Sequence, residues 1–266
     1  MKKIMLSVCA LSAMVLTSCS NEVDMFETIG TPKGTLNVDC IYDTEMTRAT
    51  QQAGKNWIIT ADNTPLVPGA NTIAQGTYTV TASNYANETA ALEANENWGD
   101  AFYTGSQNSV KVTKGESTPV TINRGKAKNA RLKAEFKNLI SKFTNVALVA
   151  DVNTTDPTHT GRNLTFTQEN ALTKLAYFNA SSTIPCKLSY DYNSTPKEKT
   201  INFTLSGAAT ENVITVNTNE NGTITISLTN IAYEEEFGTG NSEEITIDAA
   251  TGEIKKGAEV TTPSTE

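Results

Sequence analysis

The sequence predicts an all-β protein made of two tandem β-sandwiches with antiparallel sheets, which follow a removable leader. Two observations support this fold class. Short runs alternate between apolar and polar side chains, and clusters of Gly, Pro, Asn and Asp separate these runs. Thr and Asn are abundant while only 19% of the residues are charged, a composition typical of extracellular sandwich proteins.

Residues 1–18 have the layout of a secretory signal peptide. Two lysines follow Met1, the apolar run IMLSVCALSAMVL comes next, and small residues precede Cys19. The apolar run is too short to cross a hydrocarbon core about 30 Å thick as a helix. The alternative interpretation is a buried helix of the fold.

The end of this leader, Leu16-Thr17-Ser18-Cys19, resembles the lipobox of bacterial lipoproteins. The resemblance implies that the Cys19 thiol is alkylated with a diacylglycerol, that the chain is cut before Cys19, and that the new amine receives a further acyl chain such as palmitate. Several acyl chains anchor a protein firmly. The acidic segment after Cys19 resembles a surface-sorting signal of Bacteroidetes lipoproteins, so we expect a lipid-anchored outer-membrane protein at the cell surface. An ordinary signal peptide with a chance cysteine is the alternative.

The charge of the chain limits its partners. The full chain carries a net charge of −8, and the leader holds two lysines and no acidic residue, so the mature 248 residues carry about −10. An acidic chain argues against binding nucleic acid and against a polybasic membrane patch. We therefore expect the acyl chains to provide the contact with the membrane.

Two cysteines remain once the leader is removed and Cys19 is acylated. Cys40 lies in the alternating run LNVDC and Cys186 in IPCKL, and both positions are predicted to face a core. The secretory compartment permits a disulfide, but two buried free thiols in separate domains are the preferred interpretation. No CxxC motif or His–Cys cluster supports a zinc site.

Residues 19–33 are predicted to form a flexible tether, and residues 34–124 the N-terminal sandwich. Tyr78, Val80 and Ala82 should lie on one face of their strand. The predicted elements are strands at 34–43 and 56–62, a turn cluster in NTPLVPGAN, a strand at 71–84, a short helix around Glu88–Glu96, and a hairpin at 109–123 with a Lys-Gly turn.

Residues 125–252 are predicted to form the C-terminal sandwich, and residues 253–266 a disordered tail. A polar and basic stretch at 125–129 marks the boundary, and Asn221-Gly222 predicts the turn of a hairpin. Strands are expected at 130–136 and 145–152, with one helical turn in KNLISKF between them, and then in NLTFTQ, KLAYFN, CKLSYDY, TINFTLSG, NVITVN, GTITISLTN and EITIDA.

Four stretches together resemble an uncharacterised family of gut Bacteroidetes surface lipoproteins, a domain of unknown function that stands close to the fimbrillin-like proteins. They are GTLNVDCIYDTEMTRAT, IAQGTYTVTAS, WGDAFYTGSQNSVKVTKGESTPVTIN and KNARLKAEFKNLISKFTNVALVADV. The resemblance covers most of the mature chain. It implies two sandwiches of transthyretin-like or immunoglobulin-like type and a pilus or adhesion context, without a settled biochemical activity.

The resemblance to fimbrillins also gives Arg48 a role. In those pilins a trypsin-like protease cuts after an Arg that follows the first strand, and Arg48 stands at the matching place after the strand at 34–43. A missing strand leaves unpaired backbone groups and an apolar slot that another subunit's strand can fill. This hypothesis expects the first strand at a sheet edge, with EITIDAATGEI as the candidate C-terminal donor. The alternative is that Arg48 is an ordinary exposed loop residue.

Signals for catalysis or metal binding are weak. The single histidine, His159, lies in a polar loop and is expected to be solvated, and the three acids of YEEEF (233–237) share one segment instead of facing each other across a cleft. Asp151, Asn153 and Asp156 offer oxygen atoms to Ca²⁺, but their spacing misses the EF-hand pattern and Asx turns explain it equally well. We therefore expect no enzyme activity, no cofactor and no metal.

Glycan binding through exposed aromatic side chains is the other function considered. Trp98 is the best candidate because it lies in a Gly-flanked loop, with Tyr103 nearby; the remaining aromatic candidates are Trp57, Tyr85 and Phe102. Aromatic residues make up only 7% of the chain, and two sandwich cores need most of them.

The sequence therefore predicts a non-enzymatic surface lipoprotein with a structural or adhesive role. It would be a fimbrillin-like pilus subunit or anchor assembled by strand exchange, or a tethered adhesin. Its expected partners are the membrane, through the acyl chains, and other fimbrial subunits or a host or glycan surface. The alternative is a glycan-binding surface lipoprotein.

Overall fold

The computed structural model describes residues 31–41, 57–123, 125–153, 160–232 and 242–255. These residues form two compact units. Unit 1 contains residues 31–41, 59–81 and 106–122, and unit 2 contains residues 57–58, 82–105 and the described residues from 123 onward. The chain therefore passes between the units several times. Residues 82–105, which the sequence analysis assigns to the N-terminal sandwich, belong to unit 2.

Unit 1 is a β-sandwich of two sheets. One sheet has the strand order β4-β1-β7 and the other the order β3-β2-β5-β6. Apolar residues at alternate positions, such as Leu36 and Val38 of β1 and Val80 of β5, are buried between the sheets, as their alternation predicts. The strands are β1 (Lys33–Ile41), β2 (Ile58–Ala61), β3 (Thr64–Leu66), β4 (Gly69–Ala74), β5 (Gly76–Ser83), β6 (Thr104–Val112) and β7 (Ser117–Asn123).

Two predictions for this unit are wrong. The stretch at 109–123 is not a hairpin, because β6 and β7 lie in different sheets and the Lys-Gly turn carries the chain from one layer to the other. The predicted strand at 71–84 is two strands: the chain turns at Gln75, so that β4 pairs with β1 while β5 joins the second sheet. The predicted turn cluster NTPLVPGAN contains β3 and the start of β4. The alternation of apolar and polar residues identifies the buried face of a strand, but it does not identify the strand with which it pairs.

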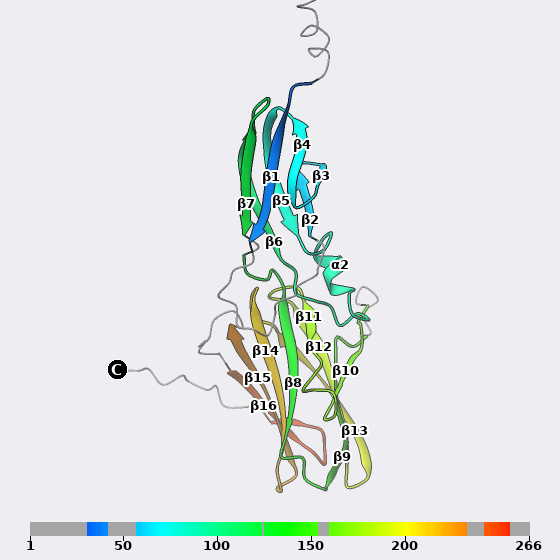
Figure 1. Cartoon of the computed structure of the whole chain (residues 1–266). Helices are drawn as coiled ribbons and strands as arrows, with labels where there is room; N and C mark the ends of the chain where they lie inside the picture. Colours follow the sequence, from blue (N-terminus) through cyan, green and yellow to red (C-terminus); the bar gives the residue numbers. More distant parts are fainter. Residues whose placement is uncertain (1–30, 42–56, 124, 154–159, 233–241, 256–266) are drawn as a thin grey trace, which may run out of the picture. The chain divides into compact units, whose positions relative to one another are not determined.

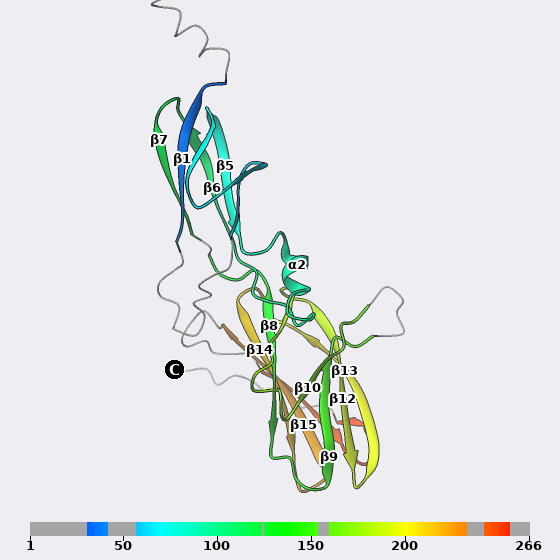
Figure 2. The same cartoon turned by 45° about the vertical axis from the view of Figure 1, so that its right-hand side comes forward.

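Unit 2 is a larger sandwich, and Figure 2 shows β8 and β14 in one layer and β9, β12 and β13 in the other. The sheet orders are β11-β8-β14-β15-β16-β17 and β10-β9-β12-β13. The elements are α2 (Glu88–Leu92), β8 (Ala130–Lys137), β9 (Phe143–Ala150), β10 (Leu164–Thr167), β11 (Ala176–Phe178), β12 (Thr183–Tyr192), β13 (Thr195–Thr204), β14 (Thr210–Thr218), β15 (Thr223–Ala232), β16 (Ser242–Asp248) and β17 (Ile254–Lys255).

The first of these sheets is mixed, because β14 pairs antiparallel with β15 but parallel with β8. The predicted antiparallel β-sandwich is confirmed in its general form, and the parallel pair β8–β14 is a local departure from it. The hairpin predicted from Asn221-Gly222 is confirmed: Thr218 pairs with Ile224, and Gly222 has a φ of 72°. The two-residue strand β17 lies inside the segment predicted to be a disordered tail, and it pairs with β16.

Helical structure is scarcer than the sequence predicts. The helix expected to reach Glu96 ends at Leu92, after which Asn95, Glu96 and Asn97 all have positive φ and form turns. Its start is capped by Asn87, whose side chain accepts a hydrogen bond from the Ala90 N–H at 2.8 Å. KNLISKF contains no helix; it links β8 to β9 through one turn, in which the Phe143 N–H donates to the Ile140 carbonyl at 2.9 Å.

The Cys186 thiol lies in the core of unit 2 and is fully buried, and Cys40 on β1 is half-buried. Both are free thiols, as preferred from the sequence. Burial raises the pKa of Cys186 from 9.0 to about 12, because the thiolate would lose its solvation. The thiol is therefore protonated and unreactive at neutral pH.

This buried thiol predicts a loss of stability at alkaline pH. The unfolded chain releases the Cys186 proton at about pH 9 and the folded chain only at about pH 12, so the contribution of this group is intact below pH 9 and is lost between pH 9 and 12. We expect the free energy of unfolding to fall by about 1.4 kcal/mol per pH unit in this window relative to Cys186→Ala. Urea titrations from pH 8 to 10.5 measure the difference, and parallel curves for the two proteins would contradict it.

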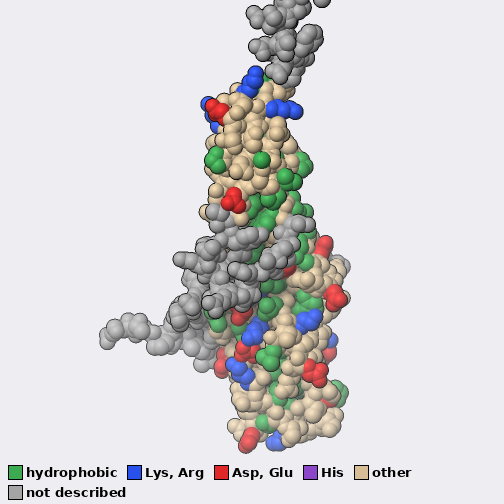
Figure 3. Space-filling view, in the orientation of Figure 1, with side chains coloured by type: hydrophobic (Ala, Val, Ile, Leu, Met, Phe, Trp, Pro, Cys, Tyr) green, Lys and Arg blue, Asp and Glu red, His purple; other side chains and the backbone are tan. Residues whose placement is uncertain are grey.

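Lys and Arg side chains are interspersed with Asp and Glu side chains on the face shown in Figure 3. Within the described ranges, no helix has the length and apolar character needed to cross a membrane.

Candidate functional site

The first strand of the fold, β1, is the middle strand of its sheet. It pairs antiparallel with β4 from Lys33↔Ala74 to Val38↔Gly69, and it adjoins β7 on its other side. Figure 1 shows β1 and β7 running in the same direction. The expectation that this strand lies at a sheet edge is wrong. Loss of β1 would therefore expose the edges of two strands, β4 and β7.

Backbone hydrogen bonds hold the start of β1 on both of its sides. The Thr35 N–H donates to the Glu116 carbonyl at 2.8 Å, and the Gly115 N–H donates to the Lys33 carbonyl at 3.0 Å. On the β4 side, the Gln75 N–H donates to the Pro32 carbonyl at 2.6 Å. The start of β1 is thus bonded to the turns that precede β7 and follow β4.

An apolar slot receives the inner face of β1. Leu36 is 0% exposed and Val38 is 2% exposed, whereas Asn37 and Asp39, which alternate with them, face solvent. Full burial of each aliphatic side chain contributes about 1.5–3 kcal/mol. The buried side chains that remain in unit 1 without β1 are Ile59, Ala61, Leu66, Ile73, Val80, Val110, Val112, Val120 and Ile122.

Gly34 allows β1 to approach the opposite sheet closely. A Cβ at this position would overlap the Thr113 carbonyl oxygen and would lie 2.8 Å from Val112 Cγ1. Because neither the backbone nor the buried valine can easily move, the slot accepts only glycine here. A strand that replaces β1 therefore needs a glycine two positions before its first deeply buried apolar residue.

Several residues singled out in the sequence lie outside the described ranges. These are Cys19, Arg48, Asp156, His159 and residues 233–237. The lipid anchor, the processing site and the solvated histidine thus remain predictions. Residues 244–254, the candidate donor segment, are described, and they form β16, a turn and β17 within unit 2.

The two residues proposed for glycan contact are placed in the packing of unit 2. Tyr103 is 7% exposed and belongs to a small apolar cluster with Ala101, Ala127 and Ala209. Trp98 packs edge-on against Phe166, with ring centroids 5.0 Å apart. These positions favour structural roles over an exposed aromatic platform.

The remaining aromatic candidates also make contacts within unit 2. Trp98 has a second contact, because Lys174 Nζ lies 5.1 Å from the centre of its ring. Trp57 packs against the cluster that contains Tyr103, and the Tyr85 hydroxyl donates to Asp100 at 2.7 Å. Phe102 is only partly exposed.

The side chains of Asp151 and Asn153, which were considered as calcium ligands, accept hydrogen bonds from other residues of the chain. Asp151 accepts hydrogen bonds from the backbone N–H and Nε of Arg162, the latter at 3.1 Å. The Asn153 side chain accepts from the Gly161 N–H at 2.7 Å. These contacts join residues 8 and 11 positions apart, so they are not the local Asx turns offered as the alternative. No cluster of three potential metal ligands occurs among the described residues.

Two polar side chains that no sequence pattern singled out, Asn84 and Asn129, form hydrogen bonds to the backbone of residues 100–103. Asn84 exchanges hydrogen bonds with the Tyr103 N–H and the Ala101 carbonyl, at 2.8 and 2.7 Å. The fully buried Asn129 donates to the Asp100 carbonyl at 2.7 Å and accepts from the Phe102 N–H at 3.1 Å. A buried amide that satisfies backbone groups in this way has no distinctive sequence signal.

The model of a domain of unknown function, DUF4493, matches residues 30–264. The chain belongs to the DUF4493 family. No curated protein matches it.

Among solved structures, the chain shows a distant similarity to surface proteins of Bacteroides and Parabacteroides. A candidate cell adhesion protein from Bacteroides ovatus is 10% identical, with a TM-score of 0.38, and the match covers 73% of this chain and 95% of the other. A fimbrial assembly protein from Parabacteroides distasonis is 12% identical, with a TM-score of 0.36 and coverage of 84% and 97%. A candidate adhesin from Bacteroides ovatus is 14% identical, with a TM-score of 0.28 and coverage of 85% and 86%.

Proposed function

We propose that this DUF4493 protein is a non-enzymatic cell-surface protein with a structural or adhesive role, and that β1 is an exchangeable strand. Cleavage after Arg48 would separate β1 from the rest of the chain, and a strand from another subunit would take its place. In this proposal the acyl chains on Cys19 hold the uncut protein on the outer membrane. The alternative, glycan binding, gains no support from the packing of Trp98 and Tyr103.

The hypothesis of strand exchange expected β1 at a sheet edge, and its central position corrects that expectation; what supports the proposal is the gap that loss of a middle strand leaves. An edge strand can leave a sheet and expose one row of unpaired groups, whereas a middle strand leaves two facing rows and an apolar slot between the sheets. Such a gap is costly to leave empty, because buried backbone groups and aliphatic surface both lose their partners. After loss of β1, binding of another strand with the same alternation of apolar and polar side chains would therefore be strongly favourable.

Cleavage of the mature chain by an arginine-specific protease tests the proposal. We expect a product that begins at Ala49, releases residues up to Arg48 and assembles into oligomers visible by size-exclusion chromatography and electron microscopy. Arg48→Ala should stay uncut at this site and remain monomeric, while Arg124→Ala, a matched control, should behave like the wild type. A cut chain that retains residues 31–41 and stays monomeric would contradict strand exchange.

A further inference from the structure

One strand of unit 2, β9, is covered along only half of one edge. β10 pairs with β9 from Leu164↔Ala150 to Thr167↔Ala147 and then turns away. On the opposite side β9 pairs with β12 as far as Phe143↔Tyr192. Within the described part of the chain, no strand lies beside residues 143–146 on the β10 side. The edge of β9 at residues 143–146 could therefore pair with one more short strand.

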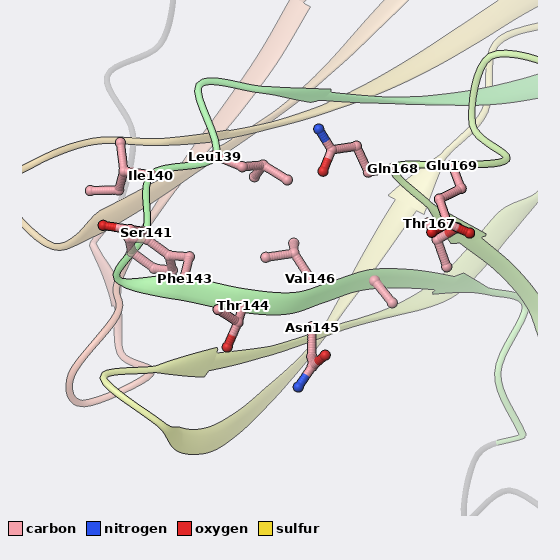
Figure 4. Close-up of a pocket in the computed structure, with 11 residues that line it drawn as sticks. Leu139, Ile140, Ser141, Phe143, Thr144, Asn145, Val146, Thr167, Gln168 and Glu169 are labelled. Carbon is pink, nitrogen blue, oxygen red and sulfur yellow. The ribbon is translucent and has the colours of Figure 1, made fainter.

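A groove runs along this uncovered edge. Its volume is about 610 Å³. Figure 4 shows Leu139, Val146 and Gln168 pointing into the same space, while Thr144 and Asn145 point away from it. Val146 is 8% exposed, and Leu139 and Ile140 are partly buried against the core of unit 2. The groove therefore combines an apolar floor with an unpaired strand edge.

We propose that this groove binds an extended polypeptide segment, which adds to β9 as a short strand in line with β10. Leu164 and Phe166 of β10 point into the core while Thr165 faces solvent, so an added strand that continues this alternation places its next apolar side chain over the floor of the groove. Main-chain hydrogen bonds to the open edge would provide affinity, and the apolar floor would select side chains. This site lies in unit 2 and does not depend on exchange of β1.

The chemistry of the groove indicates the composition of the segment. Among the residues that line it, Glu169 is the one with an ionisable side chain, and it is exposed at the β10 end. A Lys or Arg at the first position of the added strand would lie near this carboxylate, whereas an acidic residue there would be repelled. The described strands of this chain are already paired within their own sheets. Because the mature chain carries a net charge of about −10, a second copy would be repelled, and we assign the occupant to a basic, extended segment of a different protein.

The test uses the uncut mature chain and a defined peptide, acetyl-Lys-Val-Thr-Val-Thr-Val-amide. Nuclear magnetic resonance titration should show saturable shifts of the amide signals of residues 143–147 and 168–169. The control peptide has the same side chains but N-methyl groups on alternate residues, which remove main-chain donors. We expect its affinity to be at least tenfold lower, because strand addition requires those donors.

A charge-reversal pair tests the position of the peptide. Glu169→Lys should weaken binding of the lysine peptide at least fivefold, whereas Glu198→Lys, on the exposed face of β13, should leave it unchanged. The absence of saturable shifts, equal binding of the N-methylated peptide, or shifts centred elsewhere would each overturn the proposal. Concentration-dependent shifts of the same amides without peptide would show that a second copy occupies the groove, which would overturn the assignment to a different protein. None of these results depends on cleavage at Arg48.

Discussion

Replacement of Arg162 by alanine is expected to lower the free energy of unfolding of unit 2 by about 3–5 kcal/mol, since this is the typical cost of breaking a buried ion pair. The guanidinium of Arg162 donates to the Asp151 carboxylate at 3.1 Å and to the carbonyls of Leu92, Asn97 and Tyr177 at 3.2, 2.9 and 2.7 Å.

The position of Arg162 explains the size of this effect. Its guanidinium carbon lies 4.3 Å from the centre of the Phe178 ring, and its side chain is only 18% exposed. One side chain thus joins the turn after α2, the loop before β10 and strand β11. The alanine variant leaves three carbonyls with one donor fewer and removes the cation beside a carboxylate that is 11% exposed.

Tryptophan fluorescence during urea titration can follow this effect selectively, because both tryptophans, Trp57 and Trp98, belong to unit 2. Arg162→Lys keeps the charge but loses the planar fork, so we expect an intermediate loss. Lys187→Ala removes an exposed partner of Glu198 and should change stability by no more than about 0.5 kcal/mol. Equal losses for Arg162→Ala and Lys187→Ala would mean that Arg162 does not hold these segments together.

The sequence predicts most strands of this fold because each strand has one buried and one exposed face. Leu36 and Val38, or Ile184 and Leu188, alternate with polar neighbours and are buried as expected. Pairing is different, because it depends on contacts between residues far apart in the chain. The Thr35 N–H of β1 donates to the carbonyl of Glu116, in the turn that precedes β7, and no local pattern in either segment encodes that partner.

The candidate site was predictable only in part for the same reason. The run LNVDC identifies a strand with one buried face, but its place between β4 and β7 follows from long-range pairing. Likewise, a tryptophan beside a glycine has the same local pattern whether its ring is exposed or packed. The Trp98 ring is packed because Phe166, in another segment of unit 2, lies against it.

A disulfide between β1 and β4 is expected to abolish assembly after cleavage at Arg48, if strand exchange is the function. Asn37 and Ala70 are paired across the two strands, and both side chains are exposed. Directly paired Cα atoms in antiparallel strands lie about 4.5–5.5 Å apart, within the range that a disulfide spans. The double variant Asn37→Cys, Ala70→Cys, in a Cys40→Ser background, should therefore link β1 covalently to its slot.

The oxidised double variant should be cut by the protease yet stay monomeric, and addition of a reductant should restore assembly to the level of the Cys40→Ser parent. Thr183 and Thr204 form an exposed cross-strand pair between β12 and β13, so Thr183→Cys, Thr204→Cys is the matched control and should assemble whether oxidised or reduced. Because the locked and released states share one sequence, the comparison separates departure of β1 from any effect of substitution. Assembly of the oxidised β1–β4 variant would mean that subunits associate while β1 remains in its slot, through a surface other than the one that strand exchange requires.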